Sequence, residues 1–303
     1  MSKHKSLFFQ FQTACPFVKN FDKYSDKRQE HNTGHIVKSL SSKTALLDFA
    51  KQFTDYIKAE YPTVKKVSAI TPSMAQSFID KKCNEGCSIE TIKTYQSYLN
   101  KFEVGVRNCF NSKVSYHTEI KKDLVQERVT IKQYSFTDNE IKRILDVKRP
   151  SESYKVILFN SYTGCRINTC EKLQVRDLHI VGDKVYVDIH KDKGGRDRTV
   201  CIESKEFASI CRDLRKGKDP NQRVFNIKAD SVNKWLRTRC KALNIRTPEG
   251  LVKSGNHSIR KNVAEHYAAR CGIGKSGVSR TMEFLGHGKY RPDLEQTYLH
   301  SKK

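Results

Sequence analysis

The chain has 303 residues, of which 37% are hydrophobic and 30% charged, and lysine plus arginine outnumber aspartate plus glutamate by 57 to 33. This length allows one large domain or two ordinary ones, and the formal net charge of +24 favours nucleic acid as a partner before an anionic membrane surface. No run approaches the roughly 18 apolar residues of a membrane-spanning helix, so we expect a soluble cytoplasmic protein that is associated with DNA and not with a membrane.

The N-terminal part of the chain predicts a small helical domain. Residues 1–42 are basic and irregular, and their sequence leaves open a DNA-contacting arm or a small ordered cap. After them, "SKTALLDFAKQFTDYIKAEY" has apolar residues at helical spacing. A second helix begins at Thr71 and Pro72 and a third at Ser88, which is a favoured capping residue. We expect residues 43–112 to form a helical, basic DNA-binding domain.

A linker and a second domain are predicted next. Residues 113–134 are charged and only weakly periodic, which is typical of a connection between domains. Thr137 with Glu140 three residues later is a capping-box pattern that predicts the start of a helix. The segment "SYKVILFNSYTGCR" predicts a mostly buried helix that ends near Gly164. Residues 135–303 would then form the second domain.

Strands and further helices are predicted within that second domain. The runs "KVYVDIH" and "RDRTVCI" have the composition of strands, and the glycines of the intervening "KDKGG" suit a hairpin turn. Three later segments, "ADSVNKWLRTRCKAL", "SIRKNVAEHYAARCG" and "GVSRTMEFLGH", have helical patterns. The predicted fold is therefore mainly α with a small antiparallel β-sheet (α+β), in two domains.

Ten cysteines are present, and their spacing does not match a common metal site. Cys83 and Cys87 are separated by three residues, and Cys165 and Cys170 by four, whereas structural zinc sites use other spacings. The remaining cysteines are scattered among apolar neighbours. We predict buried, reduced thiols with no disulfide framework and no metal.

Several polar residues are not explained by the helix and strand patterns. Each has an ordinary explanation when it is taken alone, such as a solvated arginine, a surface lysine in a hairpin or a histidine at a helix end. Those explanations do not account for the set as a whole or for its order along the chain. The residues are Arg166, Lys193, His257, Arg260, His287 and Tyr298.

The segments around these residues resemble a known family. "TGCRINTCEKLQVRDL", "KGGRDRTVCI", "HSIRKNVAEHYAARCG" and "LGHGKYRPDLEQTYLH", in this order, resemble the catalytic domain of the tyrosine recombinases (phage integrases). The resemblance spans about residues 135–300. Residues 43–112 resemble the family's helical core-binding domain more weakly, through "TIKTYQSYLNKF". The resemblance thus implies a core-binding domain followed by a catalytic domain.

The resemblance assigns the positively charged residues to a phosphate group. Arg166 matches the arginine of the family's first box, and Asp177 matches the acidic residue that closes it. Arg260 matches the arginine of the second box. Two arginines can clamp the oxygens of a DNA phosphate with planar forks of donors, without a metal or another cofactor. Lys193 is the better match for the hairpin lysine, with Lys191 as the alternative, and it would protonate the departing 5′ oxygen.

The remaining matches concern the nucleophile. Tyr298 matches the tyrosine that attacks the phosphate, and His300 follows it in a frequent context. A tyrosine hydroxyl has a pKa of about 10 and needs a base or a positive field, so His257 is the candidate base. His287 would hold the phosphate by hydrogen bonding. Tyr290 is a competitor, but it lies too close to His287 in the sequence.

Three features depart from the family pattern. Thr169 stands where a glutamate is common, and Glu171 comes two residues later. The spacing between His287 and Tyr298 is about two residues longer than usual, from which we expect a mobile tyrosine segment that swings into the site. Only five residues follow Tyr298, so we expect subunits to contact each other by means other than a long C-terminal helix.

The resemblance implies a site-specific recombinase or integrase of a mobile element or phage. It would cleave and rejoin double-stranded DNA through a 3′-phosphotyrosyl link, and it would act as a homo-oligomer, a tetramer, on paired half-sites. One alternative is DNA relaxation by the same chemistry, as in type IB topoisomerases. The other alternative is a non-catalytic DNA-binding protein on this fold.

Overall fold

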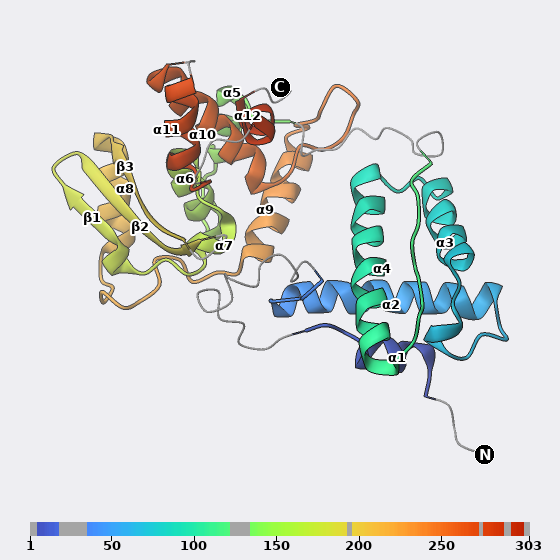
Figure 1. Cartoon of the computed structure of the whole chain (residues 1–303). Helices are drawn as coiled ribbons and strands as arrows, with labels where there is room; N and C mark the ends of the chain where they lie inside the picture. The colour runs from blue at the N-terminus through green and yellow to red at the C-terminus, as the bar shows by residue number, and fades with distance from the viewer. Residues whose placement is uncertain are drawn as a thin grey trace. The chain divides into compact units, whose positions relative to one another are not determined.

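The computed structural model of the chain describes residues 5–17, 35–121, 134–192, 196–272, 275–287 and 292–299. The chain divides into two compact units, Met1–Arg128 and Val129–Lys303, and each has its own hydrophobic core (Figure 1). None of the helices in the described ranges combines the length and the apolar character that a bilayer-spanning segment requires.

The first unit is helical, with an aromatic core. Phe11, Phe49, Phe53, Phe78 and Phe102 are all buried in it. The three helices predicted from the sequence are confirmed, and the expected hydroxyl caps are present at Thr71 and Ser88. The elements are α1 (Leu7–Thr13), α2 (Leu40–Glu60), the 3-10 helix η2 (Val67–Ala69), α3 (Pro72–Asn84) and α4 (Ile89–Phe110).

Segments on both sides of the predicted helical domain pack onto this unit. Helix α1 buries Leu7 and Phe11, which supports the ordered cap for this part of residues 1–42. On the other side, Tyr116 is fully buried and its hydroxyl donates a hydrogen bond of 2.7 Å to the carbonyl oxygen of Val67. The rest of the predicted linker, residues 122–133, lies outside the described residues, so the linker stays a prediction.

Gly105 permits the close approach of α1 to α4. A Cβ atom at this position would overlap the carbonyl oxygen of Ala14. We expect Gly105→Ala to lower the free energy of unfolding by up to about 2 kcal/mol, because the overlap (~1–3 kcal/mol) outweighs the gain in helix propensity (~1 kcal/mol). Urea unfolding of the full chain measures this change. The control is Asn100→Ala, at an exposed position of the same helix, and a loss as large in the control would contradict the packing argument.

The second unit combines helices with a three-stranded antiparallel sheet, which confirms the predicted fold class. The strand order is β1-β2-β3, with Val187 of β2 opposite Val200 of β3. The strands are β1 (Leu178–Val181), β2 (Lys184–Asp192) and β3 (Arg196–Glu203), and the helices are α5 (Asp138–Leu145), α6 (Glu152–Thr163), α7 (Ile167–Cys170), η5 (Val175–Asp177), α8 (Lys205–Arg215), α9 (Ala229–Ala242), α10 (Asn256–Cys271), α11 (Lys275–Phe284) and α12 (Pro292–Leu299).

Local signals in this unit agree with the structure at two points. Thr137 and Glu140 form the predicted capping box at the start of α5. Gly164 ends α6 with φ of 58°, a left-handed conformation that glycine adopts without the steric cost of a side chain. Because the chain turns sharply there, the residues that follow Gly164 begin α7 in a new direction.

Strand β1 and helices α7, α8 and α12 were not predicted from the sequence. Strand β1 has only four residues, too few for a clear alternation. Helix α8 did carry a signal, since Phe207, Cys211 and Leu214 recur at helical spacing and are buried. All ten cysteines are free. Cys109 and Cys201 are exposed and Cys15, Cys87 and Cys271 are partly exposed, so the prediction of buried thiols holds for only five of the ten.

Candidate active site

Arg166 is held at the junction between α6 and α7. It is the residue that precedes α7, and its side chain is half-buried. Buried amides fix this junction to the start of α10. The amide of Asn160 donates to Asn256 Oδ1 (2.8 Å), and the amide of Asn256 donates to the carbonyl oxygen of Cys165 (3.0 Å). The backbone on which Arg166 stands is therefore tied to α10.

The first turn of α10 carries His257 and Arg260. Residues three apart lie on the same side of a helix, but here the two side chains differ in burial. His257 is exposed, whereas Arg260 is 1% exposed. Arg260 Nη1 donates to the carbonyl oxygen of Gly164 (2.6 Å), and Nη2 donates to that of Leu285. Arg260 Nη2 also lies 3.3 Å from His287 Nε2.

Tyr298 lies among these same residues. Its ring centroid is 5.2 Å from that of His257 and 5.0 Å from that of His287. The guanidinium carbon of Arg260 lies 5.6 Å from the centre of the tyrosine ring. Tyr298 is only 3% exposed. The expected loose tyrosine segment is therefore not what the structure shows, because α12 packs against α10 and buries this side chain.

Burial lowers the pKa of the Arg260 guanidinium, but the group stays charged at neutral pH. Desolvation lowers the pKa of Arg260 to about 10; the nearby Tyr298 hydroxyl opposes this shift, and the positive charge of Arg166 adds to it. At neutral pH the group is still protonated. Among the residues that the structure describes, the buried Nε atom has no hydrogen-bond partner, so this cation retains a donor for a ligand.

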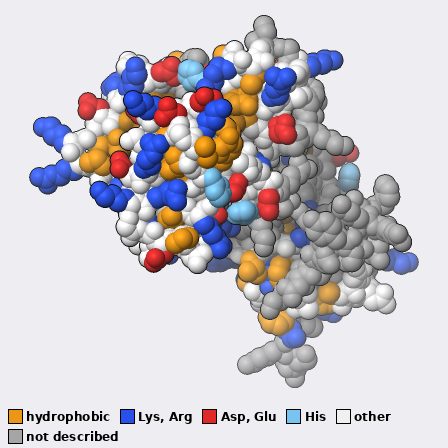
Figure 2. All heavy atoms as spheres, turned by 90° about the vertical axis from the view of Figure 1, so that its left-hand side faces the viewer, with side chains coloured by type: hydrophobic (Ala, Val, Ile, Leu, Met, Phe, Trp, Pro, Cys, Tyr) orange, Lys and Arg blue, Asp and Glu red, His pale blue; other side chains and the backbone are white. Residues whose placement is uncertain are grey.

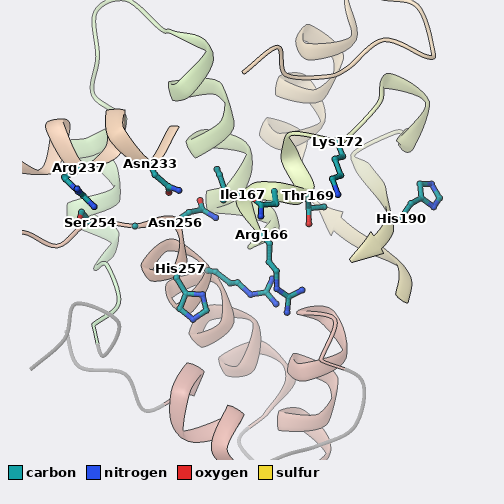
Figure 3. Close-up of a pocket in the computed structure, with 13 residues that line it drawn as sticks. Arg166, Ile167, Thr169, Lys172, His190, Asn233, Arg237, Ser254, Asn256 and His257 are labelled. Carbon is teal, nitrogen blue, oxygen red and sulfur yellow. The ribbon is translucent and has the colours of Figure 1, made fainter. Parts of the chain in front are cut away.

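Arg166, His257 and Arg260 line one pocket of about 710 Å³. Arg166 points from the start of α7 toward the first turn of α10, where His257 lies (Figure 3). Asn233 and Arg237 of α9 flank one side of the pocket. Lys172 and His190 lie on the other side. The pocket is thus rich in cationic and hydrogen-bonding groups, as a site for a phosphate group requires.

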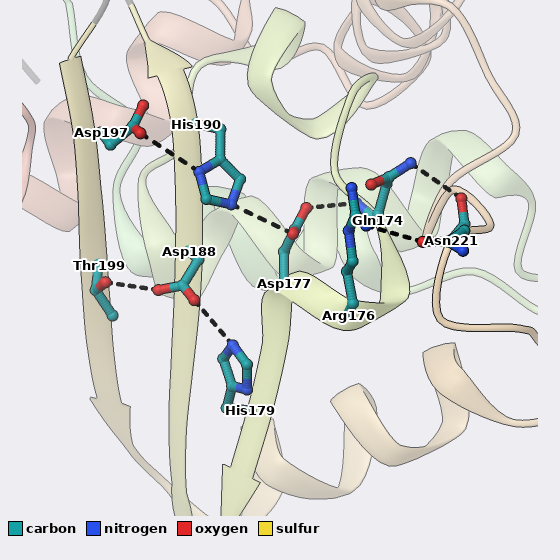
Figure 4. A network of polar contacts seen from close by, with 9 residues as sticks. All are labelled: Gln174, Arg176, Asp177, His179, Asp188, His190, Asp197, Thr199 and Asn221. Atoms are coloured by element: carbon teal, nitrogen blue, oxygen red, sulfur yellow. Dashed lines mark hydrogen bonds and ion pairs between the residues drawn. The ribbon is translucent and has the colours of Figure 1, made fainter.

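The sheet and η5 are joined beside this pocket by polar contacts (Figure 4). Asp177 is buried, accepts a hydrogen bond from the backbone N–H of Gln174 (2.8 Å), and lies 3.5 Å from His190 Nε2. Asp188 joins all three strands. Burial opposes its ionisation, but hydrogen bonds from Thr199 and His179 outweigh burial and lower the pKa of Asp188.

The sequence of residues 135–303 matches the phage integrase family. The match covers more than half of the chain. The chain belongs to this family of tyrosine recombinases.

Individual relatives agree with this membership. The TnP I resolvase of Bacillus thuringiensis is 26% identical over 278 residues, covering 83% of this chain and 95% of the relative. The XerH site-specific recombinase bound to palindromic difH substrate has a similar fold, with a TM-score of 0.65 at 17% identity, over 97% of this chain and 91% of that one. A lambda integrase tetramer bound to a Holliday junction also has a TM-score of 0.65, at 14% identity, over 100% of this chain and 80% of that one.

Five of the six predicted site residues of this recombinase come together in space. Arg166, His257, Arg260, His287 and Tyr298 approach one another from the start of α7, from α10, from the end of α11 and from α12. The sixth, Lys193, lies outside the described residues, as do Tyr290 and His300. The alternative lysine, Lys191, belongs to β2. The assignment of the hairpin lysine therefore stays a prediction.

Arg198 was not predicted as a site residue from the sequence. Its guanidinium donates to the carbonyl oxygen of Phe284 at the end of α11, and its charge contributes to the lowered pKa of Arg260. A signal was available in β3. Residues two apart lie on one face of a strand, so Arg198 shares a face with the buried Val200 and Ile202. An arginine on the inward face of a strand indicates a structural or functional partner.

Glu171, which departs from the family pattern, has a defined contact. Its carboxylate accepts a hydrogen bond of 3.1 Å from the backbone N–H of Ala229, the first residue of α9. A carboxylate at a helix N-terminus is favourable, because the first N–H groups lack partners within the helix. Glu171 thus connects the stretch that follows Arg166 to α9.

Positive charge is spread over the surface as well as concentrated in the site. On the face that carries the sheet, lysine and arginine side chains are distributed widely, with acidic side chains between them (Figure 2). Such a distribution attracts a polyanion over a broad area. The pocket differs because two of its three arginines, Arg166 and Arg260, are partly or wholly buried.

We expect inorganic sulfate to stabilise this recombinase by binding between Arg166 and Arg260. A ligand that binds only the folded state adds about 2.7 kcal/mol at a hundredfold excess over its Kd, which raises the Tm by about 2–4 °C per kcal/mol. Thermal unfolding with sulfate and with sodium chloride of equal ionic strength measures the effect. The rise in Tm that is specific to sulfate should disappear in Arg166→Ala. It should persist in Arg212→Ala, whose side chain lies outside the pocket. An equal increment in both variants would indicate a general salt effect.

Proposed function

We propose that this chain is a site-specific recombinase that cleaves and rejoins DNA through a 3′-phosphotyrosyl link to Tyr298. One observation carries the proposal. The ring of Tyr298 neighbours the imidazoles of both His257 and His287, with centroids 5.2 and 5.0 Å away, and the guanidinium carbon of Arg260 lies 5.6 Å from its centre. A tyrosine in a structural role does not need two imidazoles and a buried cation around it, whereas a nucleophile that attacks a phosphate does.

The two arginines would supply positive charge to the phosphate group. Each guanidinium presents several donors and keeps its charge at neutral pH. The buried Arg260 is already oriented by the carbonyl oxygens of Gly164 and Leu285, so little reorganisation is needed when charge develops in the transition state. Arg166, whose positive charge acts on Arg260, would bind the same phosphate group.

Proton transfers would be divided between two sides of the phosphate. His257 would accept the proton of the Tyr298 hydroxyl as that oxygen attacks phosphorus. Lys193 would give a proton to the departing 5′ oxygen. His287 would hold the phosphate by a hydrogen bond. The bond between phosphorus and the 5′ oxygen breaks as the bond to the tyrosine oxygen forms, so a later attack by a 5′ hydroxyl reverses the step without an external energy source.

We propose double-stranded DNA with paired half-sites as the substrate and a tetramer of this chain as the active assembly. The net charge of +24 supports a nucleic-acid partner. A lambda integrase forms a tetramer on a Holliday junction, and XerH binds a palindromic substrate. A role in a mobile element is supported by the similar fold of the Tn1549 transposon integrase, which has a TM-score of 0.61 at 15% identity. Such a protein would act in the cytoplasm, in association with DNA.

Tyr298→Phe should abolish covalent attachment to DNA and leave folding and DNA binding nearly unchanged, because only the hydroxyl oxygen is removed. The assay uses a nicked half-site substrate, which traps the covalent product, in excess EDTA. Wild-type protein should form the product, since the arginines and the lysine supply the positive charge that a metal would otherwise supply. The matched variant Tyr290→Phe should react like wild type.

Two results of this assay would contradict the assignment. If Tyr298→Phe still reacts while Tyr290→Phe does not, Tyr290 is the nucleophile. If the wild-type protein binds the substrate but forms no covalent product, the chain is a binding protein on this fold. Once covalent chemistry is established, relaxation of a supercoiled plasmid without a recombination site separates a topoisomerase from a recombinase, which requires two sites.

Arg260→Ala should reduce the rate of covalent attachment by about 10²- to 10³-fold, as for the loss of one donor that stabilises developing negative charge. Its effect on DNA affinity should be small, because one phosphate contact is one among many. Arg260→Lys should restore little of the rate, since an ammonium cannot bind two carbonyl oxygens and a phosphate with a planar fork. Single-turnover kinetics measures these rates, and a rate near wild type for Arg260→Lys would contradict the role of the fork.

A further inference from the structure

Helix α9 borders the candidate active site and presents two polar side chains to it. Asn233 and Arg237 line the same pocket as Arg166, His257 and Arg260 and lie on one side of it in Figure 3. They are four residues apart, so they lie on one face of the helix. An adjacent face of α9 is buried through Val232, Leu236 and Cys240, which fixes the direction of the polar face.

Neither side chain is used by the fold. Within the part of the chain that the structure describes, Asn233 and Arg237 make no side-chain hydrogen bond or ion pair. Arg239 on the same helix differs, since it donates to the backbone carbonyl oxygens of Arg143, Ile144 and Asp146. The donors and acceptors of Asn233 and Arg237 are therefore available to a ligand in the pocket.

The chemistry of this pair fits base edges better than phosphates. An asparagine amide is neutral and carries a donor and an acceptor side by side. Its carbonyl oxygen would repel the oxygens of a phosphate, because both groups are hydrogen-bond acceptors. The same arrangement binds the N6 and N7 positions of adenine, and an arginine fork binds O6 and N7 of guanine. Four helical residues span about 6 Å, and successive bases rise about 3.4 Å, so the two side chains would contact bases one or two steps apart.

The position of α9 is tied to the candidate catalytic residues. The carboxylate of Glu171 accepts a hydrogen bond from the first residue of α9, and Glu171 lies just beyond the short helix that follows Arg166. A helix held in this way lies at a fixed distance from the phosphate that Arg166 would bind. Bases contacted from α9 would then lie at a defined spacing from the cleaved bond.

We propose that Asn233 and Arg237 determine part of the DNA sequence specificity, by contacting an adenine and a guanine in the major groove beside the cleaved phosphate. This inference rests on the proposed recombinase function, since it places DNA in the same pocket. The groove is wide enough to admit an α-helix, and the pair provides the direct contacts that phosphate-binding arginines do not.

The test selects bound sequences from a library of duplexes with a randomised segment. The full chain carries Tyr298→Phe in every case, so that binding alone is measured. Arg237→Ala should lose the preference for guanine at one position, and Asn233→Ala the preference for adenine at a nearby one. Each change should cost roughly 5- to 150-fold in affinity for the preferred duplex. The matched control is Lys234→Ala, exposed on the same helix and outside the pocket lining, which should keep both preferences.

A different pattern would overturn the inference. If Arg237→Ala weakens binding equally for all sequences and lowers the slope of log affinity against log salt by about 1, the arginine contacts a phosphate. Unchanged preferences in both variants would exclude α9 from base recognition. Because the selection does not depend on cleavage, failure of the covalent assay would refute the proposed chemistry and leave this result intact.

Discussion

The candidate site depends on the hydrogen bonds that the buried guanidinium of Arg260 makes. Its bonds to the carbonyl oxygens of Gly164 and Leu285 join the end of α6 to the end of α11, and these two segments lead directly to Arg166 and His287. Burial of a cation is costly unless it is compensated, and no carboxylate pairs with Arg260 among the described residues. A bound phosphate would supply the negative charge that the buried guanidinium lacks. Arg260 therefore joins two segments of the fold and also provides a cation for a phosphate.

Hydrogen bonds of buried asparagine amides fix the other parts of the site relative to one another. The amides of Asn160 and Asn256 connect α6, the Arg166 junction and α10 in the interior, where buried polar groups require good partners and therefore restrict the alternatives. Glu171 extends this connection to α9. The helices that carry the candidate phosphate-binding and base-contacting residues are thus held by specific hydrogen bonds as well as by packing.

Local patterns predicted the fold and the site to different degrees. Caps at Thr71, Ser88 and Thr137 depend on residues three positions away, so they are visible in the sequence. The order of the motifs identified residues that the structure then brings together. The burial of Tyr298 and the identity of the partner of Arg198, the carbonyl oxygen of Phe284, depend on segments distant in sequence, which no local pattern reports. The longer spacing before Tyr298 suggested a loose segment, whereas packing of α12 on α10 decides the outcome.

The docking of α12 on α10 has a consequence for a DNA strand end attached to Tyr298. Such an end would be held on the helix that carries His257 and Arg260, and it could not diffuse away from the residues that formed the link. Return of a 5′ hydroxyl to that phosphorus would then be an intramolecular event, for which effective concentrations reach about 10⁵–10⁸ M in well-oriented systems. Resealing would depend on delivery of the 5′ end, since the 3′ end would already be in place.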